Sequence, residues 1–164
     1  MLRPFRAGDV EDALAYRNDR EFVRFLPHIP YPFTRRNAEA FVERNMAEDW
    51  EKSPTFAVAL NGQVIGTVSF EVEAESDTAM IGYAIGRPWW GRGIATEAAT
   101  AAIAWAHREF GLTRVWASTQ AGNTRSQRVL EKLGMHREAV RAKDDPGRDG
   151  RPADEVVYGL DLKR

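Results

Sequence analysis

The spacing of hydrophobic positions along this chain changes from a helical period to a period of two and back again. After Thr34, apolar residues recur at helical spacing, at Ala38, Phe41, Val42 and Met46. This spacing predicts an amphipathic helix, and Thr34 is a residue type that favours the N-cap position in front of it. Asp9 precedes a shorter stretch with the same period, so we expect a helix with Asp9 as its N-cap there too.

In the centre of the chain, apolar and polar residues alternate, as in Val68, Phe70 and Val72 with their polar neighbours. Asn61-Gly62 precedes this run and is a strong signal for a tight hairpin turn. The expected strands are Leu2 to Phe5, Thr55 to Leu60, Gln63 to Glu73, Ala79 to Ile85, Arg114 to Thr119, Met135 to Val140 and Val156 to Leu162. The later helices are expected at Ala95 to Phe110 and from an Asn123 cap to Leu133, and Lys143 to Pro152 is expected to be a mobile loop.

This order of elements predicts an α+β fold with a mixed sheet. A first strand is followed by two helices, a three-stranded meander, and then helix, strand, helix and two strands. A doubly wound nucleotide-binding fold would alternate strand and helix throughout, so that class is excluded. No repeat or linker divides the chain, and we expect residues 1–164 to form a single domain.

The composition narrows the possible partners. Twenty-three basic and 24 acidic residues give a net charge of −1, which argues against nucleic acid bound through bulk positive charge. The chain has no cysteine, which excludes disulfides, a thiolate metal site and a cysteine nucleophile, and its three scattered histidines do not suggest a metal centre. Without an apolar leader or membrane-length run, a cytoplasmic protein with no membrane partner is expected.

The segment from Pro88 to Thr96 carries the clearest chemical signal, because it joins a predicted strand to a predicted helix through Gly91 and Gly93. Glycines let the backbone approach a ligand closely, and the start of a helix offers unpaired N–H groups to an anion. The alternative is a tight turn that binds nothing. The P-loop and dinucleotide glycine patterns do not fit this segment.

The segment resembles the signature of the GNAT acetyltransferases, [Gln/Arg]-x-x-Gly-x-[Gly/Ala], with Gly93 and Ala95 at its small positions. Trp90 stands where the consensus has Gln or Arg, but Trp-Gly-Arg-Gly-Ile-Ala-Thr-Glu is similar to the variant of the RimJ/RimL-like branch, which acetylates protein N-termini and other amines. Further segments match that branch in order: Leu2-Arg3-Pro4, Ile81-Gly82-Tyr83, Asn123-Thr-Arg-Ser126, Val129 to Met135, Asp149-Gly150-Arg151 and Asp154 with Val157 to Leu160.

The resemblance implies a GNAT-like, mostly antiparallel sheet flanked by helices, in which the fourth and fifth strands splay apart, and acetyl-CoA as the cofactor, with CoA as product and no metal. The backbone of Tyr83, Ala84 and Ile85 would meet the thioester and the pantetheine. The implied pyrophosphate site is Trp90, Gly91, Arg92, Gly93, Ile94, Ala95 and Thr96, with Asn123 on the pantetheine arm and Arg128 near the 3′-phosphate, where Arg125 is also expected.

The resemblance also suggests catalytic roles. Ser126 would donate to the departing sulfur, and the alternative is a purely structural residue in the first helical turn. Relatives carry a glutamate where this chain has Met80, so Glu71, next to Ser69 on the polar side of its strand, is the candidate base; a solvated strand face is the alternative. His28 and Tyr31 are candidates for the acceptor pocket, together with Ser69 and Glu71.

The sequence therefore predicts an acetyl-CoA-dependent N-acetyltransferase that acts by direct attack of an amine in a ternary complex. A protein N-terminal α-amine is favoured because its pKa of about 7.7–8.0 leaves it partly neutral without a strong base. Small amines such as an aminoglycoside, a polyamine or an amino-acid-like compound stay open, because Glu71, Glu73, Glu75 and Asp77 cluster on one hairpin. A non-catalytic acyl-CoA sensor and a homodimer also stay open.

Overall fold

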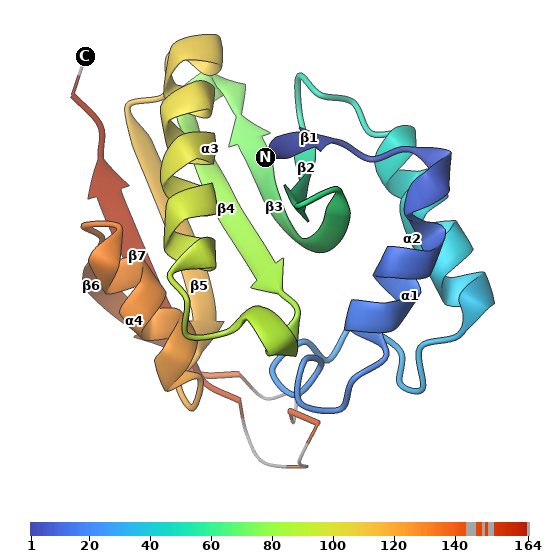
Figure 1. Ribbon diagram of the computed structural model, residues 1–164. Helices are drawn as coiled ribbons and strands as arrows, with labels where there is room; N and C mark the ends of the chain where they lie inside the picture. Colours follow the sequence, from blue (N-terminus) through green and yellow to red (C-terminus); the bar gives the residue numbers. More distant parts are fainter. Residues whose placement is uncertain (144–146, 149, 151–152, 164) are drawn as a thin grey trace.

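The computed structural model describes residues 1–143, 147–148, 150 and 153–163 and contains a seven-stranded sheet with helices on both faces (Figure 1). The strands lie in the order β1-β2-β3-β4-β5-β7-β6. Their bounds are β1 Leu2–Pro4, β2 Thr55–Leu60, β3 Gln63–Glu73, β4 Thr78–Ile85, β5 Arg114–Gln120, β6 His136–Arg141 and β7 Glu155–Asp161. The helices are α1 Val10–Arg17, α2 Arg35–Met46, α3 Ile94–Phe110 and α4 Thr124–Lys132, with short 3-10 turns η1 Ala7–Asp9, η2 Ala74–Ser76 and η3 Arg87–Trp89.

The sheet is mixed and mostly antiparallel, as the sequence predicts. Its one parallel pair joins β4 to β5, and this ladder is short: it begins at Thr78–Arg114 and ends at Met80–Trp116. Beyond that point β4 continues to pair with β3 as far as Ile85, while β5 continues to pair with β7 as far as Gln120. The two strands therefore separate toward the carboxyl end of β4, and the expected splay is confirmed.

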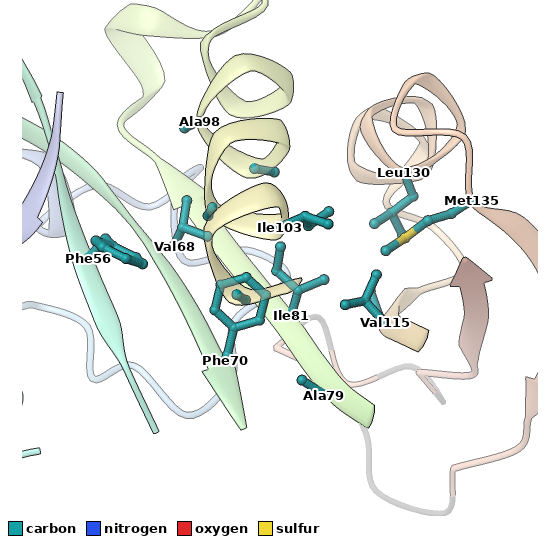
Figure 2. Packing of buried hydrophobic residues seen from close by; sticks show 14 of the residues in the cluster. Phe56, Val68, Phe70, Ala79, Ile81, Ala98, Ile103, Val115, Leu130 and Met135 are labelled. Atoms are coloured by element: carbon teal, nitrogen blue, oxygen red, sulfur yellow. The ribbon is translucent and has the colours of Figure 1, made fainter. Parts of the chain in front are cut away.

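The face of the sheet under α3 and α4 holds the larger hydrophobic core. Figure 2 shows Val68, Phe70 and Ile81 of the sheet packed against Ile103 of α3, with Leu130 of α4 beside them. On α3 the small residues Ala98, Ala99, Ala102 and Ala106 are buried, which brings the helix axis close to the strands. Thus the alanine-rich face of α3 packs against the sheet, and this packing holds the start of the helix beside the end of β4.

Helices α1 and α2 cover the other face of β2 and β3. Because side chains alternate along a strand, Ala57 and Val64 join this second cluster while their neighbours Val58 and Ile65 join the first. Arg17 of α1 is buried in the second cluster with its guanidinium carbon 3.7 Å from the centre of the Phe41 ring. Burial lowers the pKa of Arg17.

Most predicted boundaries agree with the structure to within two residues, including the Asn61-Gly62 turn, where both residues have positive φ (51° and 80°). Thr34 caps α2 by accepting a hydrogen bond from the Asn37 N–H. Asp9 occupies the N-cap position of α1, but its carboxylate makes no cap bond to that helix. The predicted N-cap position is therefore confirmed, and the carboxylate accepts hydrogen bonds from the Arg3 guanidinium and the Arg6 N–H instead.

The part of the C-terminal motif at Asp149 and Arg151 lies outside the described residues, as does most of the predicted loop from Lys143 to Pro152. Of that loop, Arg148 is described: its Nε donates to the Val23 carbonyl at 2.8 Å, and its Nη2 donates to the Leu26 carbonyl at 3.2 Å. This segment between β6 and β7 therefore touches the connection between α1 and α2.

Candidate active site

The glycine turn between β4 and α3 has the backbone of an anion-binding site. Gly91 and Gly93 both have left-handed φ values, 77° and 74°, and a Cβ at either position would meet no heavy atom within 4 Å. Gly93 is the N-cap of α3, and the first helical hydrogen bond runs from the Glu97 N–H to the Gly93 carbonyl. The N–H groups ahead of Glu97 are therefore available to a ligand in the open space around the turn.

A cavity of about 540 Å³ extends from this turn along Tyr83 to Ile85, the part of β4 that no longer pairs with β5. The turn and the start of α3 form one wall, Tyr83 to Ile85 of β4 form the floor, and the first turns of α4 form another wall. The connection between α1 and α2 closes the remaining side with Phe22, Phe25 and Leu26. The cavity thus joins an anion site to an unpaired stretch of strand.

Trp90 holds a cation at the mouth of this cavity. Its indole Nε1 donates to the Ile85 carbonyl at 2.6 Å, which fixes the ring against the end of β4. The guanidinium carbon of Arg125 lies 3.3 Å from the centre of that ring, a cation–π stack between the turn and α4. Burial lowers the pKa of Arg125, although a guanidinium stays charged at any physiological pH.

Two hydroxyl groups from different elements meet in the lining of the cavity. The Tyr83 Oη lies 2.9 Å from the Ser126 Oγ and 2.9 Å from the Ser126 carbonyl oxygen. The N–H of Ser126 donates to the Asn123 Oδ1 at 3.1 Å, so Asn123 caps α4 and orders its first turn. Burial raises the pKa of Tyr83 to about 12.

Most residues expected to hold the cofactor line this one cavity. They are Tyr83, Ala84, Ile85, Trp90, Gly91, Gly93, Ile94, Ala95, Thr96, Asn123 and Arg128, and the candidate acid Ser126 lines it with them. Arg92 is exposed on the turn and does not line the cavity.

The candidate acceptor residues and the candidate base lie outside the cavity. Glu71 is exposed on β3 and pairs with Met80, the last residue of β4 that still pairs with β5. Ser69 is half-buried and pairs with Gly82, one residue before Tyr83. The roles of Glu71 and Ser69 therefore stay predictions, and their placement does not bring them to the hydroxyl pair.

His28 and Tyr31 lie in the connection between α1 and α2, on its exposed side. Partial burial lowers the pKa of His28, and the positive charges of Arg17, Arg148 and Arg44 lower it further. The imidazole is accordingly neutral at pH 7 and stands in a positive field. The Arg20 guanidinium carbon lies 5.7 Å from the centre of the Tyr31 ring.

Sequence reasoning missed the wall contributed by the connection between α1 and α2. Glu21, Phe22, Phe25 and Leu26 line the cavity although they lie more than sixty positions before the glycine turn. Phe22 and Leu26 pack in the second hydrophobic cluster, and the same connection carries the ion pair between Asp19 and Arg87 (2.8 Å). The sequence offers one weak signal for these lining residues: Phe22 and Phe25 are three positions apart. Thr124, Val129 and Lys132 of α4 also line the cavity and were not anticipated.

Among the residues that the structure describes, no group of His, Asp and Glu side chains is arranged to hold a metal ion. Within the same ranges, no helix is long and apolar enough to cross a membrane.

Comparison with known proteins identifies the family. The model of the acetyltransferase (GNAT) domain matches residues 1–136. The uncharacterized N-acetyltransferase YnaD of Bacillus subtilis is 31% identical over 148 residues, which cover 89% of this chain and 84% of that protein. The [ribosomal protein uS5]-alanine N-acetyltransferase of Escherichia coli is 35% identical over 100 residues, which cover 60% of this chain and 51% of that enzyme.

Solved structures agree with this assignment. An acetyltransferase of the GNAT family from Bacillus anthracis superposes with a TM-score of 0.84 at 30% identity, covering 98% of this chain and 93% of its own. The Microcin C7 self-immunity acetyltransferase MccE, solved with acetyl-CoA and AMP, has the same fold, with a TM-score of 0.88 at 21% identity over 98% of this chain and 91% of its own. The chain therefore belongs to the GNAT acetyltransferase family, resembles its RimJ/RimL-like members, and is an N-acetyltransferase.

Proposed function

We propose that this enzyme transfers the acetyl group of acetyl-CoA to the α-amine at a protein N-terminus, by direct attack in a ternary complex. The observation that carries the proposal is the continuous cavity from the glycine turn to the Tyr83–Ser126 hydroxyl pair. One end suits a pyrophosphate, the other suits a leaving sulfur, and the stretch between them is lined by the unpaired part of β4.

The residues fit acetyl-CoA, which supplies an activated thioester when bound. The open space around Gly91 and Gly93 would be filled by any side chain, so the turn is a cradle for a group that approaches the backbone. Arg125, stacked on Trp90, adds a fixed positive charge beside that cradle, and Arg128 adds a second along α4. The backbone of β4 at Tyr83 to Ile85 provides the donors that would polarise the thioester carbonyl.

The charges near His28 favour a lightly charged amine over a polycation. Burial and the charges of nearby arginines lower the pKa of His28, so His28 offers no negative charge to a polycation such as an aminoglycoside or a polyamine. One acidic residue, Glu21, lines the cavity, whereas Glu73, Glu75 and Asp77 lie at the hairpin between β3 and β4, where Glu73 pairs with Thr78. The names of two relatives agree with this choice: the E. coli protein is a [ribosomal protein uS5]-alanine N-acetyltransferase, and YdaF of B. subtilis is named "putative ribosomal N-acetyltransferase".

A panel of acceptors tests the proposal. The purified protein is incubated with acetyl-CoA and, separately, short peptides with varied first residues, the same peptides with blocked α-amines, spermidine and an aminoglycoside, and thiol release is measured. We expect release with free α-amines alone. Release only with the polyamine or the aminoglycoside would contradict the α-amine assignment. Acetyl-CoA binding without release on any amine, including folded ribosomal proteins, would favour a sensor instead.

The candidate base gives a further prediction. Glu71 is exposed and outside the cavity, so we expect Glu71→Gln to change kcat/KM by less than about threefold, whereas loss of a true general base costs about 10²–10⁴-fold. Without a general base on the enzyme, the α-amine loses its proton to water. The value of kcat/KM should then rise with pH through the amine's own pKa of about 8. The measurement is the pH–rate profile of both forms. A loss of 10²-fold or more in the variant, with an intact fold, would restore Glu71 as the base.

A further inference from the structure

The stack between Trp90 and Arg125 joins the glycine turn to α4 at the cavity. The guanidinium carbon of Arg125 lies 3.3 Å from the centre of the Trp90 ring. Two contacts hold the ring: its Nε1 donates to the Ile85 carbonyl at 2.6 Å, and its half-buried carbon atoms pack against the larger hydrophobic core. The long, exposed side chain of Arg125 therefore lies over a ring that has little freedom to move.

The stack leaves the donors of Arg125 available to a ligand. A guanidinium carries five N–H groups in its plane, and an aromatic ring contacts its face rather than its edge. Among the residues that the structure describes, none accepts a hydrogen bond from the Arg125 guanidinium. Glu21, the acidic residue of the cavity wall, forms an ion pair with Arg24 (3.9 Å). The guanidinium thus presents its donors at the cavity wall that it lines.

The position of Arg125 does not favour the stability of its own helix. Arg125 is the second residue of α4, whose first turn contains no acidic residue, and Arg128 follows three positions later. The N-terminus of a helix carries partial positive charge, so a cation there is unfavourable for the helix. An anion beside this turn would interact favourably with both arginines and with the helix end. The charges therefore favour an anionic ligand where α4 lines the cavity.

We propose that Trp90 is a positioning residue for Arg125: its ring holds the guanidinium at the cavity wall, where the N–H groups of Arg125 bind a phosphate group of the cofactor. The inference rests on the proposed function and adds this pair to the cofactor site. Phosphate suits the geometry because a planar guanidinium can donate two parallel N–H groups to two phosphate oxygens. Trp90 and Arg125 line the same cavity as Gly91 and Gly93, so one cofactor can reach both the turn and the arginine.

Arg141 and Trp116 provide a matched control elsewhere in the molecule. The guanidinium carbon of Arg141, on β6, lies 5.5 Å from the centre of the Trp116 ring, on β5, and neither residue lines the cavity. Arg141 and Arg125 are both exposed. Arg141→Met therefore removes one positive charge and one arginine–tryptophan contact, as Arg125→Met does, without touching the cofactor site.

Calorimetric titration with CoA measures the affinity without any amine acceptor. Arg125→Met should raise the Kd about tenfold or more, because it removes a charge-assisted hydrogen bond. Trp90→Leu should raise it about three- to tenfold, because the arginine stays but is no longer held. The double variant should match Arg125→Met within about twofold. Trp90→Phe, which keeps an aromatic face, should bind CoA more tightly than Trp90→Leu, and Arg141→Met should bind CoA as the unaltered protein does.

CoA carries phosphate in its pyrophosphate and at its 3′ position, and 3′-dephospho-CoA distinguishes these two sources. If Arg125 binds the 3′-phosphate, Arg125→Met and the unaltered protein should bind 3′-dephospho-CoA equally well. If Arg125 binds the pyrophosphate, the loss in Arg125→Met should be as large with 3′-dephospho-CoA as with CoA.

The titrations can overturn each part of the inference. A Kd for CoA in Arg125→Met within about twofold of the unaltered value overturns the phosphate contact. Losses that multiply in the double variant, or a Trp90→Phe as weak as Trp90→Leu, overturn the positioning role. If CoA binding depends on the pair but no amine is acetylated, the proposed function fails while this inference stands. If an α-amine is acetylated and Arg125→Met binds CoA normally, the function stands and this inference fails.

Discussion

Gly93 and Gly111 are the two residues at which the backbone enters and leaves α3. Their φ values are 74° and 64°, both are exposed, and a Cβ on either would meet no heavy atom within 4 Å. They differ only in place: Gly93 lies on the cavity and Gly111 lies at the far end of the helix. This pair separates the cost of backbone strain from the cost of a blocked ligand site.

We expect Gly93→Leu and Gly111→Leu to lower the free energy of unfolding by similar amounts, about 1–2 kcal/mol, because each forces a side chain into the left-handed region. Only Gly93→Leu should weaken acetyl-CoA binding, by more than about tenfold, because its side chain enters the space around the turn. Chemical denaturation and calorimetric titration measure the two effects. Equal affinity in the two folded variants would place the pyrophosphate elsewhere.

At the residue scale, the sequence predicts what depends on neighbours along the chain. The glycine turn, the Asn123 cap and the position of Ser126 follow from local spacing and from the family resemblance. The contacts of Trp90 with Arg125 and of Tyr83 with Ser126 could not be predicted, because each joins residues on separate elements, 43 positions apart in the second case. Nothing in a local pattern states which hydroxyl a buried phenol will meet.

Helix α4 is short. Asn123 caps its N-terminus and also lines the cavity. Asn123→Ala should lower the free energy of unfolding by about 1 kcal/mol, since it removes the cap bond to the Ser126 N–H. Asn123→Ser should recover most of that loss, because serine caps helices nearly as well. We expect acetyl-CoA affinity to fall in both variants, because neither keeps the amide. Full recovery of affinity in Asn123→Ser would make Asn123 a structural cap only.

The first strand is connected to the first helix through Asp9. Burial of Asp9 opposes its charge, but the hydrogen bonds and charges of Arg3 and Arg6 outweigh this and lower its pKa. A carboxylate with a lowered pKa in the folded state stabilises the fold above its unfolded pKa of about 3.9, and this stabilisation is lost as the pH falls through the folded value. Asp9→Asn should therefore lower stability by about 2 kcal/mol at pH 7 and by much less below pH 3.

Urea denaturation of both forms across that pH range measures this difference. A gap between Asp9→Asn and the unaltered protein that stays constant from pH 7 to pH 3 would mean that the ion pair with Arg3 contributes nothing through its charge.

At the element scale, most of the fold is readable from the sequence because each strand and helix has its own signal: a period, a cap or a turn. What is missing is the connection between α1 and α2, where Phe22 and Phe25 lie on the cavity. Its buried side chains Phe22, Val23, Ile29 and Phe33 pack in the second core, and it is also bonded to Arg87 and Arg148 from distant parts of the chain. Local pattern cannot supply such pairings.

At the scale of the whole molecule, the site depends on the separation of β4 from β5 within the sheet. The ladder between β4 and β5 ends at Met80–Trp116, the two hydrophobic cores lie on opposite faces, and the cavity lies where the strands part and α3 begins. The family resemblance predicted the splay, but the length of the ladder depends on non-local pairing. Glu71 pairs with Met80, where β4 is still paired with β5, so it lies away from the Tyr83–Ser126 contact.

The central claim is that this cavity brings acetyl-CoA to an N-terminal α-amine, and one peptide tests it most directly. The peptide carries a free α-amine and one lysine, so that both kinds of amine compete within the same molecule. After incubation with the enzyme and acetyl-CoA, fragmentation mass spectrometry locates the acetyl group. The account predicts one acetyl group on the α-nitrogen, formed more slowly with Gly93→Leu at limiting acetyl-CoA and at the unaltered rate with Gly111→Leu. Acetylation of the lysine alone, or of the α-nitrogen equally well by Gly93→Leu, would contradict it.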